Sequence, residues 1–241
     1  MIHILYLCFF YLFIYFLYIN DLLLQSGTEI TRQNFALQLF LHMATMLAFP
    51  IGVIFITRTN WKSLNINTKN AFLCGILAAT YLIMFLIGGI NSVENLYDFL
   101  YLLFSIALGE ELFFRGWSYQ RMRQINPLIA LIVSGVFFGA GHAIYPGIIA
   151  GSSLKEIITA MLFGGMSSFS LLGGIVGGAI FVALLEWGGN LLIPIFCHAI
   201  LDYEPSWIAR IVTIAVFAWL IIKRRVIEKQ SLVFWKNSTS C

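Results

Sequence analysis

The sequence predicts an all-α membrane protein, a polytopic transmembrane helical bundle with about eight crossings. Of the 241 residues, 60% are hydrophobic and only 10% are charged, and the mean hydropathy is +0.90. Because a soluble domain carries about 25% charged residues, this chain has too few polar groups to cover a surface that faces water. Two further observations predict the same fold class: long apolar runs, and an alternation of basic loops with neutral or acidic ones.

Eight segments account for the predicted crossings. The first lacks a basic leading region and a small-residue cleavage site, so we expect a retained helix and no signal peptide. Pro127 is suited to open the fifth helix. The Gly-rich stretch 154–187 is too long for one crossing, so we expect a partial or interfacial helix before the sixth span. The segments are 1–19, 35–57, 71–90, 98–114, 127–145, the later part of 154–187, 189–203 and 207–222.

Loop charge predicts the topology. Three segments are basic, and the loops between them are neutral or acidic, as the positive-inside rule requires. Both termini are therefore expected in the cytoplasm, and the short loops favour a bacterial cell membrane. The net charge of +3 is not patterned for nucleic acid, so we expect no nucleic-acid partner. The basic residues are Arg58, Lys62, Lys69, Arg121, Arg123, Lys223, Arg224 and Arg225, against Glu29 with Arg32, Glu94 with Asp98, and Glu204.

Ionisable residues within the spans are the candidates for function. A charge near the bilayer centre costs roughly 2.5–3.5 kcal/mol on insertion scales, so such residues normally face a cavity and have partners. We expect Glu186 to be interfacial. Cys197 is not expected to be a nucleophile, since a thiol without a neighbouring base is unreactive. The candidates are Glu110, Glu111, Arg115, His142, Glu186, His198 and Asp202.

Spacing predicts two pairs among these candidates. Glu111 and Arg115 are four residues apart on a helix and can pair, while Glu110 points about 100° away and remains available as a general base. Asp202 follows His198 by four residues and can fix its tautomer. The alternatives are two solvated glutamates with Arg115 as an interfacial anchor, and a polar pair that only joins two helices.

Taken together, three helices each bring an acid or a histidine to a bundle with few other buried polar groups. Such groups are stable only when satisfied, so they should converge on one wet cavity. Gly139 and Gly141 would pack the helix closely around His142, although ordinary helix packing also explains glycines. A base, two histidines and an acid in one cavity can activate water.

These residues also carry a family resemblance. The motifs Glu110-Glu111 to Arg115, Phe138 to His142 and His198 to Asp202 occur in order, each in a predicted span. In this the chain resembles the CPBP family of intramembrane proteases (CAAX proteases, Abi and bacteriocin-processing proteins), including the Rce1-like prenyl endopeptidases. The resemblance covers about residues 100–205. It implies N-terminal transmembrane helices over 1–95, a catalytic core over 96–205, and a last helix with a basic cytoplasmic tail over 206–241.

The resemblance implies a role for each motif residue. Glu110 with His142 would activate water, and His198 and Asp202 would bind the oxyanion or orient the catalytic groups. Glu111, Arg115 and Phe138 would support the site. Two mechanisms stay open: Glu110, His142 and His198 as Zn²⁺ ligands, or the same residues as a metal-free site. An ionised Asp202 cannot donate to an oxyanion, which argues against that direct role.

We therefore expect an intramembrane endopeptidase, a hydrolase whose substrates are membrane-associated, prenylated or secreted peptides that enter from the bilayer. One alternative is a proton-coupled transporter, because intramembrane acids and histidines also form proton relays. No inverted repeat supports it. The other alternative is a non-catalytic immunity or scaffold protein.

Overall fold

The computed structural model describes residues 2–22, 30–167, 170–203 and 207–238, and every regular element within them is a helix. Glu29 and Glu204, which were used in the topology prediction, lie outside these ranges. Short 3-10 and π segments are labelled η. The elements are α1 (Ile2–Ile19), α2 (Phe35–Ile56), η1 (Trp61–Leu64), α3 (Ala71–Gly89), α4 (Val93–Leu100), η2 (Tyr101–Ala107), α5 (Leu108–Glu110), η3 (Glu111–Tyr119), α6 (Gln120–Met122), α7 (Pro127–Ile149), α8 (Leu154–Phe163), α9 (Leu171–Gly188), α10 (Leu192–Tyr203) and α11 (Trp207–Ser238).

Five of the described helices, α1, α2, α3, α7 and α9, are long and apolar enough to cross a membrane. This supports a multi-pass integral membrane protein, whereas the predicted count of eight crossings is not shown. The stretch 154–187 divides into the short α8 and the spanning α9, as the sequence predicted. Helix α10 is apolar but shorter, with 12 residues.

The predicted fourth span lies inside one continuous helix formed by α4, η2, α5, η3 and α6. Its segments η2 and η3 are π-helical; at the end of η2, for example, the N–H of Leu108 bonds the carbonyl of Leu103. A π-helix bonds each residue to the fifth one along, and such turns are frequent at functional sites. Glu110 ends the three-residue α5 and Glu111 begins η3, so the two adjacent acids lie where the winding changes.

Helices α7 and α9 form the most extensive contact of the bundle, and glycines bring their backbones together. A Cβ added to Gly139 would lie 2.2 Å from the carbonyl oxygen of Ser170, and one added to Gly174 would lie 2.4 Å from the Cα of Gly139. Only glycine fits at either position. The close approach predicted near His142 is present at Gly139, where it fixes α7 against α9, but not at Gly141, where an added Cβ would meet only the Tyr6 ring at 3.9 Å.

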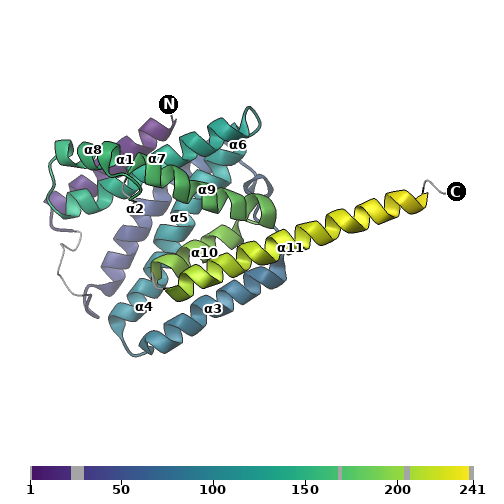
Figure 1. Ribbon diagram of the computed structural model, residues 1–241. Coiled ribbons are helices and arrows are strands. Elements are labelled where there is room, and N and C mark those ends of the chain that lie inside the picture. The colour runs from purple at the N-terminus through teal and green to yellow at the C-terminus, as the bar shows by residue number, and fades with distance from the viewer. Residues whose placement is uncertain (1, 23–29, 168–169, 204–206, 239–241) are drawn as a thin grey trace.

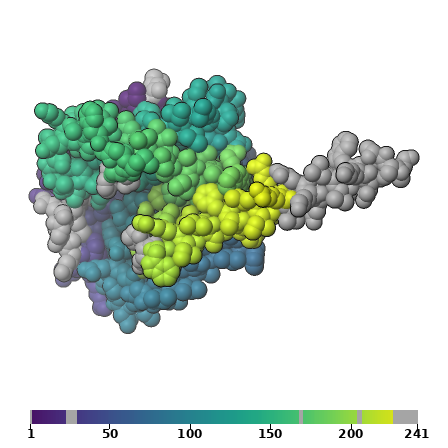
Figure 2. Space-filling model, viewed as in Figure 1, coloured from purple at the N-terminus to yellow at the C-terminus, as the bar shows by residue number. Residues whose placement is uncertain are grey.

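The basic segments meet at one end of the bundle. Arg121 donates to the Thr59 hydroxyl at 3.3 Å, Asn190 donates to the Lys69 carbonyl at 2.8 Å, and Lys223 hydrogen-bonds the Asn70 side chain. The three basic segments therefore share one end of the bundle, and the side of the membrane on which this end lies stays a prediction. Helix α11 runs from the bundle far past the other helices (Figure 1), and its first part lies between α9 and α3 in the space-filling view (Figure 2).

Candidate active site

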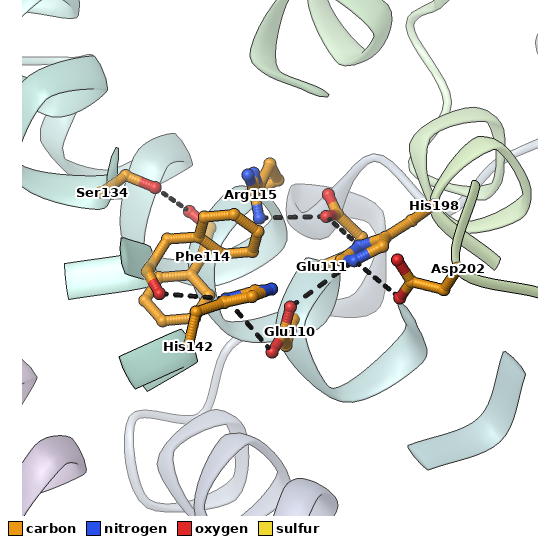
Figure 3. A network of polar contacts seen from close by, with 9 residues as sticks. Glu110, Glu111, Phe114, Arg115, Ser134, His142, His198 and Asp202 are labelled. Atoms are coloured by element: carbon orange, nitrogen blue, oxygen red, sulfur yellow. Dashed lines mark hydrogen bonds and ion pairs between the residues drawn. The ribbon is translucent and has the colours of Figure 1, made fainter. Parts of the chain in front are cut away.

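Three helices bring Glu110, His142 and His198 together. The Glu110 carboxylate lies 3.8 Å from Nδ1 of His142 and 3.6 Å from Nε2 of His198, and it points between the two rings (Figure 3). One donor atom from each residue fits within 4.8 Å of the others. Glu110 is 7% exposed and His198 is 2% exposed. The convergence expected from the sequence is therefore what the fold produces.

Glu111 and Arg115 form a fully buried ion pair beneath this cluster. Their closest atoms, Oε1 and Nη1, are 2.9 Å apart, and both side chains are 0% exposed. The guanidinium carbon also lies 4.1 Å from the ring centre of Phe138 and 5.0 Å from that of Phe181. The i, i+4 pairing prediction is confirmed, and the alternative of two solvated glutamates is wrong.

His198 is held at both ring nitrogens by carboxylates. Nδ1 lies 2.9 Å from Oε1 of Glu111, and Nε2 lies 3.3 Å from Oδ2 of Asp202. Its ring stacks on Phe181 with a centroid distance of 4.6 Å. The Asp202 side chain is 34% exposed, so it forms the rim of the site and not its buried centre.

His142 is fixed by its own helix. Nδ1 lies 3.2 Å from the Phe138 carbonyl oxygen, which can only accept, and the Phe138 ring packs 4.3 Å away. This hydrogen bond assigns the proton to Nδ1 and leaves the lone pair on Nε2. The His142 side chain is 20% exposed and lines the adjoining cavity.

The donor set suits a zinc ion. Zn²⁺ takes histidine nitrogen and carboxylate oxygen in open catalytic sites, and ligating histidines usually donate their other N–H to a carboxylate or a carbonyl. Glu111 supplies that acceptor for His198, and Phe138 supplies it for His142. A proton on Nε2 of His198 would instead satisfy Asp202, so the same residues also suit metal-free chemistry.

The cluster opens into a cavity of about 470 Å³, a size typical of ligand sites. One wall carries Glu110, His142 and Asp202. The lining also includes His42, which the sequence analysis did not single out although it is an ionisable residue in a predicted span. The remaining lining residues are mostly apolar: Phe10, Thr45, Met46, Tyr101, Leu102, Ile106, Gly141, Tyr145, Pro146 and Leu201.

Two other predicted residues lie apart from this cavity. Glu186 forms an ion pair with Arg123, and its side chain is 35% exposed, in line with the interfacial position expected for it. Cys197 is completely buried within the hydrophobic core.

Fold and site together define a multi-pass helical membrane protein with a buried carboxylate–histidine centre equipped to activate water. Residues 92–204 match the family model described as type II CAAX prenyl endopeptidase Rce1-like. The match covers a little under half of the chain and confirms the resemblance to the Rce1-like CAAX protease family, whose description is that of an endopeptidase. All of the motif residues lie within the matched stretch. No curated protein and no solved structure matches the chain.

Proposed function

We propose that this protein is an intramembrane endopeptidase that hydrolyses peptide bonds of membrane-associated substrates with water activated by Glu110 and His142. The observation that carries the proposal is the convergence of Glu110, His142 and His198, of which Glu110 and His142 line a cavity large enough for a peptide segment. The apolar lining favours prenylated or otherwise hydrophobic peptides that enter from the bilayer.

Each residue has a role in this proposal. Glu110 accepts the proton of the attacking water as general base, and the lone pair of His142 Nε2 orients that water. His198 shares its single Nε2 hydrogen between Asp202, 3.3 Å away, and the oxyanion that forms on the scissile carbonyl. Asp202 orients His198, and Glu111 with Arg115 keeps its ring in place. Glu110 then returns the proton to the leaving amine.

A metal would use the same three residues in different roles, as ligands in place of a free base and a hydrogen-bond donor. Glu110, His142 and His198 would hold a Zn²⁺ ion, which supplies Lewis-acid polarisation of the carbonyl and a more acidic water. Activity that is lost in a strong chelator and restored by Zn²⁺ would identify this version. Full activity in the chelator, with no metal in the purified protein, would identify the metal-free one.

The test is cleavage of a membrane peptide library by purified protein. We expect Glu110→Gln and His142→Ala to abolish cleavage. Glu186→Gln, which alters an exposed glutamate outside the cavity, should retain it. Thermal unfolding checks that all variants fold. Unchanged cleavage in Glu110→Gln contradicts the proposal, and Glu110-dependent proton flux in proteoliposomes without any cleavage would favour the transporter.

A further inference from the structure

The cavity has a second polar wall, centred on His42 of α2. The His42 side chain is buried, and it bonds three partners: the Gln38 carbonyl at Nδ1 (2.8 Å), the Tyr97 hydroxyl at Nδ1 (2.7 Å) and the Tyr145 hydroxyl at Nε2 (2.8 Å). The ring of Tyr101 packs against it with a centroid distance of 4.9 Å. The proposed mechanism uses none of these residues.

The partners of His42 determine which atoms of this network donate hydrogen bonds and which accept them. The Gln38 carbonyl can only accept, so Nδ1 of His42 carries a proton, and the lone pair of the neutral ring lies on Nε2. Tyr145 therefore donates its hydroxyl hydrogen to Nε2. The phenolic oxygen of Tyr145 also accepts a hydrogen bond from the Tyr101 hydroxyl, which leaves it one further lone pair. Tyr145 lines the cavity, so this lone pair is the acceptor that it offers to a ligand there.

Helix α7 sets the position of this acceptor relative to the catalytic residues. Tyr145 follows His142 by three residues, so the two side chains leave neighbouring points of one helix face, with Cβ atoms about 5–6 Å apart. An extended peptide advances about 3.3 Å per residue. A substrate whose scissile bond lies at His142 therefore brings a peptide group within about two residues of that bond to Tyr145.

We propose that Tyr145 is a substrate-binding residue that accepts a hydrogen bond from a backbone N–H of an extended peptide, and that His42 is the positioning residue that holds the Tyr145 hydroxyl in this orientation. The inference rests on the proposed function for its substrate class. It adds the residue that would align the peptide chain beside Glu110 and His142. Because it recognises backbone, this contact accepts many side chains.

The experiment compares a cleaved peptide with depsipeptides in which single amides within two residues of the scissile bond are replaced by esters. An ester has no N–H to donate. Dissociation constants are measured by fluorescence anisotropy on wild type, Tyr145→Phe and Tyr97→Phe. Tyr97 is the matched control, because it bonds the same histidine but does not line the cavity.

We expect one ester position to weaken binding to wild type by about threefold to tenfold, the effect of one hydrogen bond. Tyr145→Phe should weaken the amide peptide by a similar factor and abolish the difference between amide and ester. Tyr97→Phe should preserve that difference. An amide–ester difference that persists in full in Tyr145→Phe, or amide binding unchanged by this variant, overturns the inference. Cleavage is scored separately: binding that depends on Tyr145 without any turnover would refute the protease and leave the inference standing.

Discussion

Arg115 carries the buried positive charge that balances the carboxylate of Glu111. It is fully buried, it neutralises Glu111 at 2.9 Å, and its guanidinium packs against Phe138 and Phe181. Removing one partner of a buried pair leaves an uncompensated charge, which costs about 3–5 kcal/mol. We therefore expect Arg115→Met to lower the free energy of unfolding in detergent by about that amount.

A double variant separates charge from packing in this prediction. Replacing both partners with neutral groups removes the stranded carboxylate, so Glu111→Gln combined with Arg115→Met should recover much of the lost stability. If the double variant unfolds as readily as the single one, then the cost comes from packing around Phe138, and the ion pair contributes little.

Asp202 offers a test of how His198 is oriented. Its carboxylate lies 3.3 Å from Nε2, and Asn at this position can still accept a hydrogen bond, although without charge. Since charged hydrogen bonds exceed neutral ones by about 1 kcal/mol, Asp202→Asn should lower kcat/KM roughly fivefold. Asp202→Leu, which cannot accept, should lower it roughly 10- to 100-fold.

One result for Asp202→Asn would contradict the orienting role. A higher kcat/KM in Asp202→Asn than in wild type would mean that the amide donates directly to the oxyanion. Position 202 would then contact the substrate, and the orienting role that we assign to Asp202 would be wrong.

The sequence predicted the local pairs and the convergence of Glu110, His142 and His198, but it missed the long-range bonds of His42. Glu111 with Arg115 and His198 with Asp202 follow from a spacing of four residues on a helix. The bonds of His42 join residues 55 and 103 positions away, in Tyr97 and Tyr145. In the sequence, only the free-energy cost of placing His42 in a membrane span indicates that this residue needs a polar partner. Nothing in the sequence indicates which of the tyrosines in the apolar helices is that partner.

Among the elements, the α7–α9 pair controls the geometry of the site, because α7 carries Phe138 and His142. A methyl group at Gly139 would meet the backbone of Ser170, which cannot yield as a flexible side chain does. We expect Gly139→Ala to lower the free energy of unfolding by about 1–3 kcal/mol, typical of overpacking. Cleavage should fall with it, since α7 must move away from α9.

Gly177→Ala is the matched control on the other helix. Its added Cβ would meet only the Phe138 ring edge at 3.8 Å, an ordinary contact. We expect this variant to be as stable as wild type or slightly more so, because alanine favours helix. Equal stability of the two alanine variants would contradict the close packing of the helix backbones at Gly139.

Element boundaries show where sequence patterns stop being informative. The fifth predicted span ended at Tyr145, next to Pro146, yet α7 continues to Ile149. A proline lacks an N–H and crowds the carbonyl four residues before it, here that of His142, so a helix often ends or kinks at this point; α7 instead continues for three more residues. The π-helical winding of η2 and η3 depends on tertiary packing and has no signature in hydrophobic periodicity.

For the whole molecule, the basic end predicts a measurable topology. We expect Lys62 and Glu94, which precede and follow α3, on opposite sides of the membrane, with Lys62 in the cytoplasm. After replacement of the exposed Cys8 and the terminal Cys241 by serine, a membrane-impermeant maleimide should label Glu94→Cys in intact cells. Lys62→Cys should react only after permeabilisation, and labelling of both in intact cells would contradict the proposed orientation.

The π-helical winding before Glu110 lets this helix lose a single residue without turning its acids away from the site. Deleting one residue within η2 would let the bonds relax from the fifth residue to the fourth, and the helix would survive as an ordinary one. The wide turn would absorb the missing residue, so Glu110 and Glu111 would keep their positions around the helix axis. A deletion in the ordinary α-helical α4 has no such reserve and would rotate both acids by about 100° away from His142 and His198.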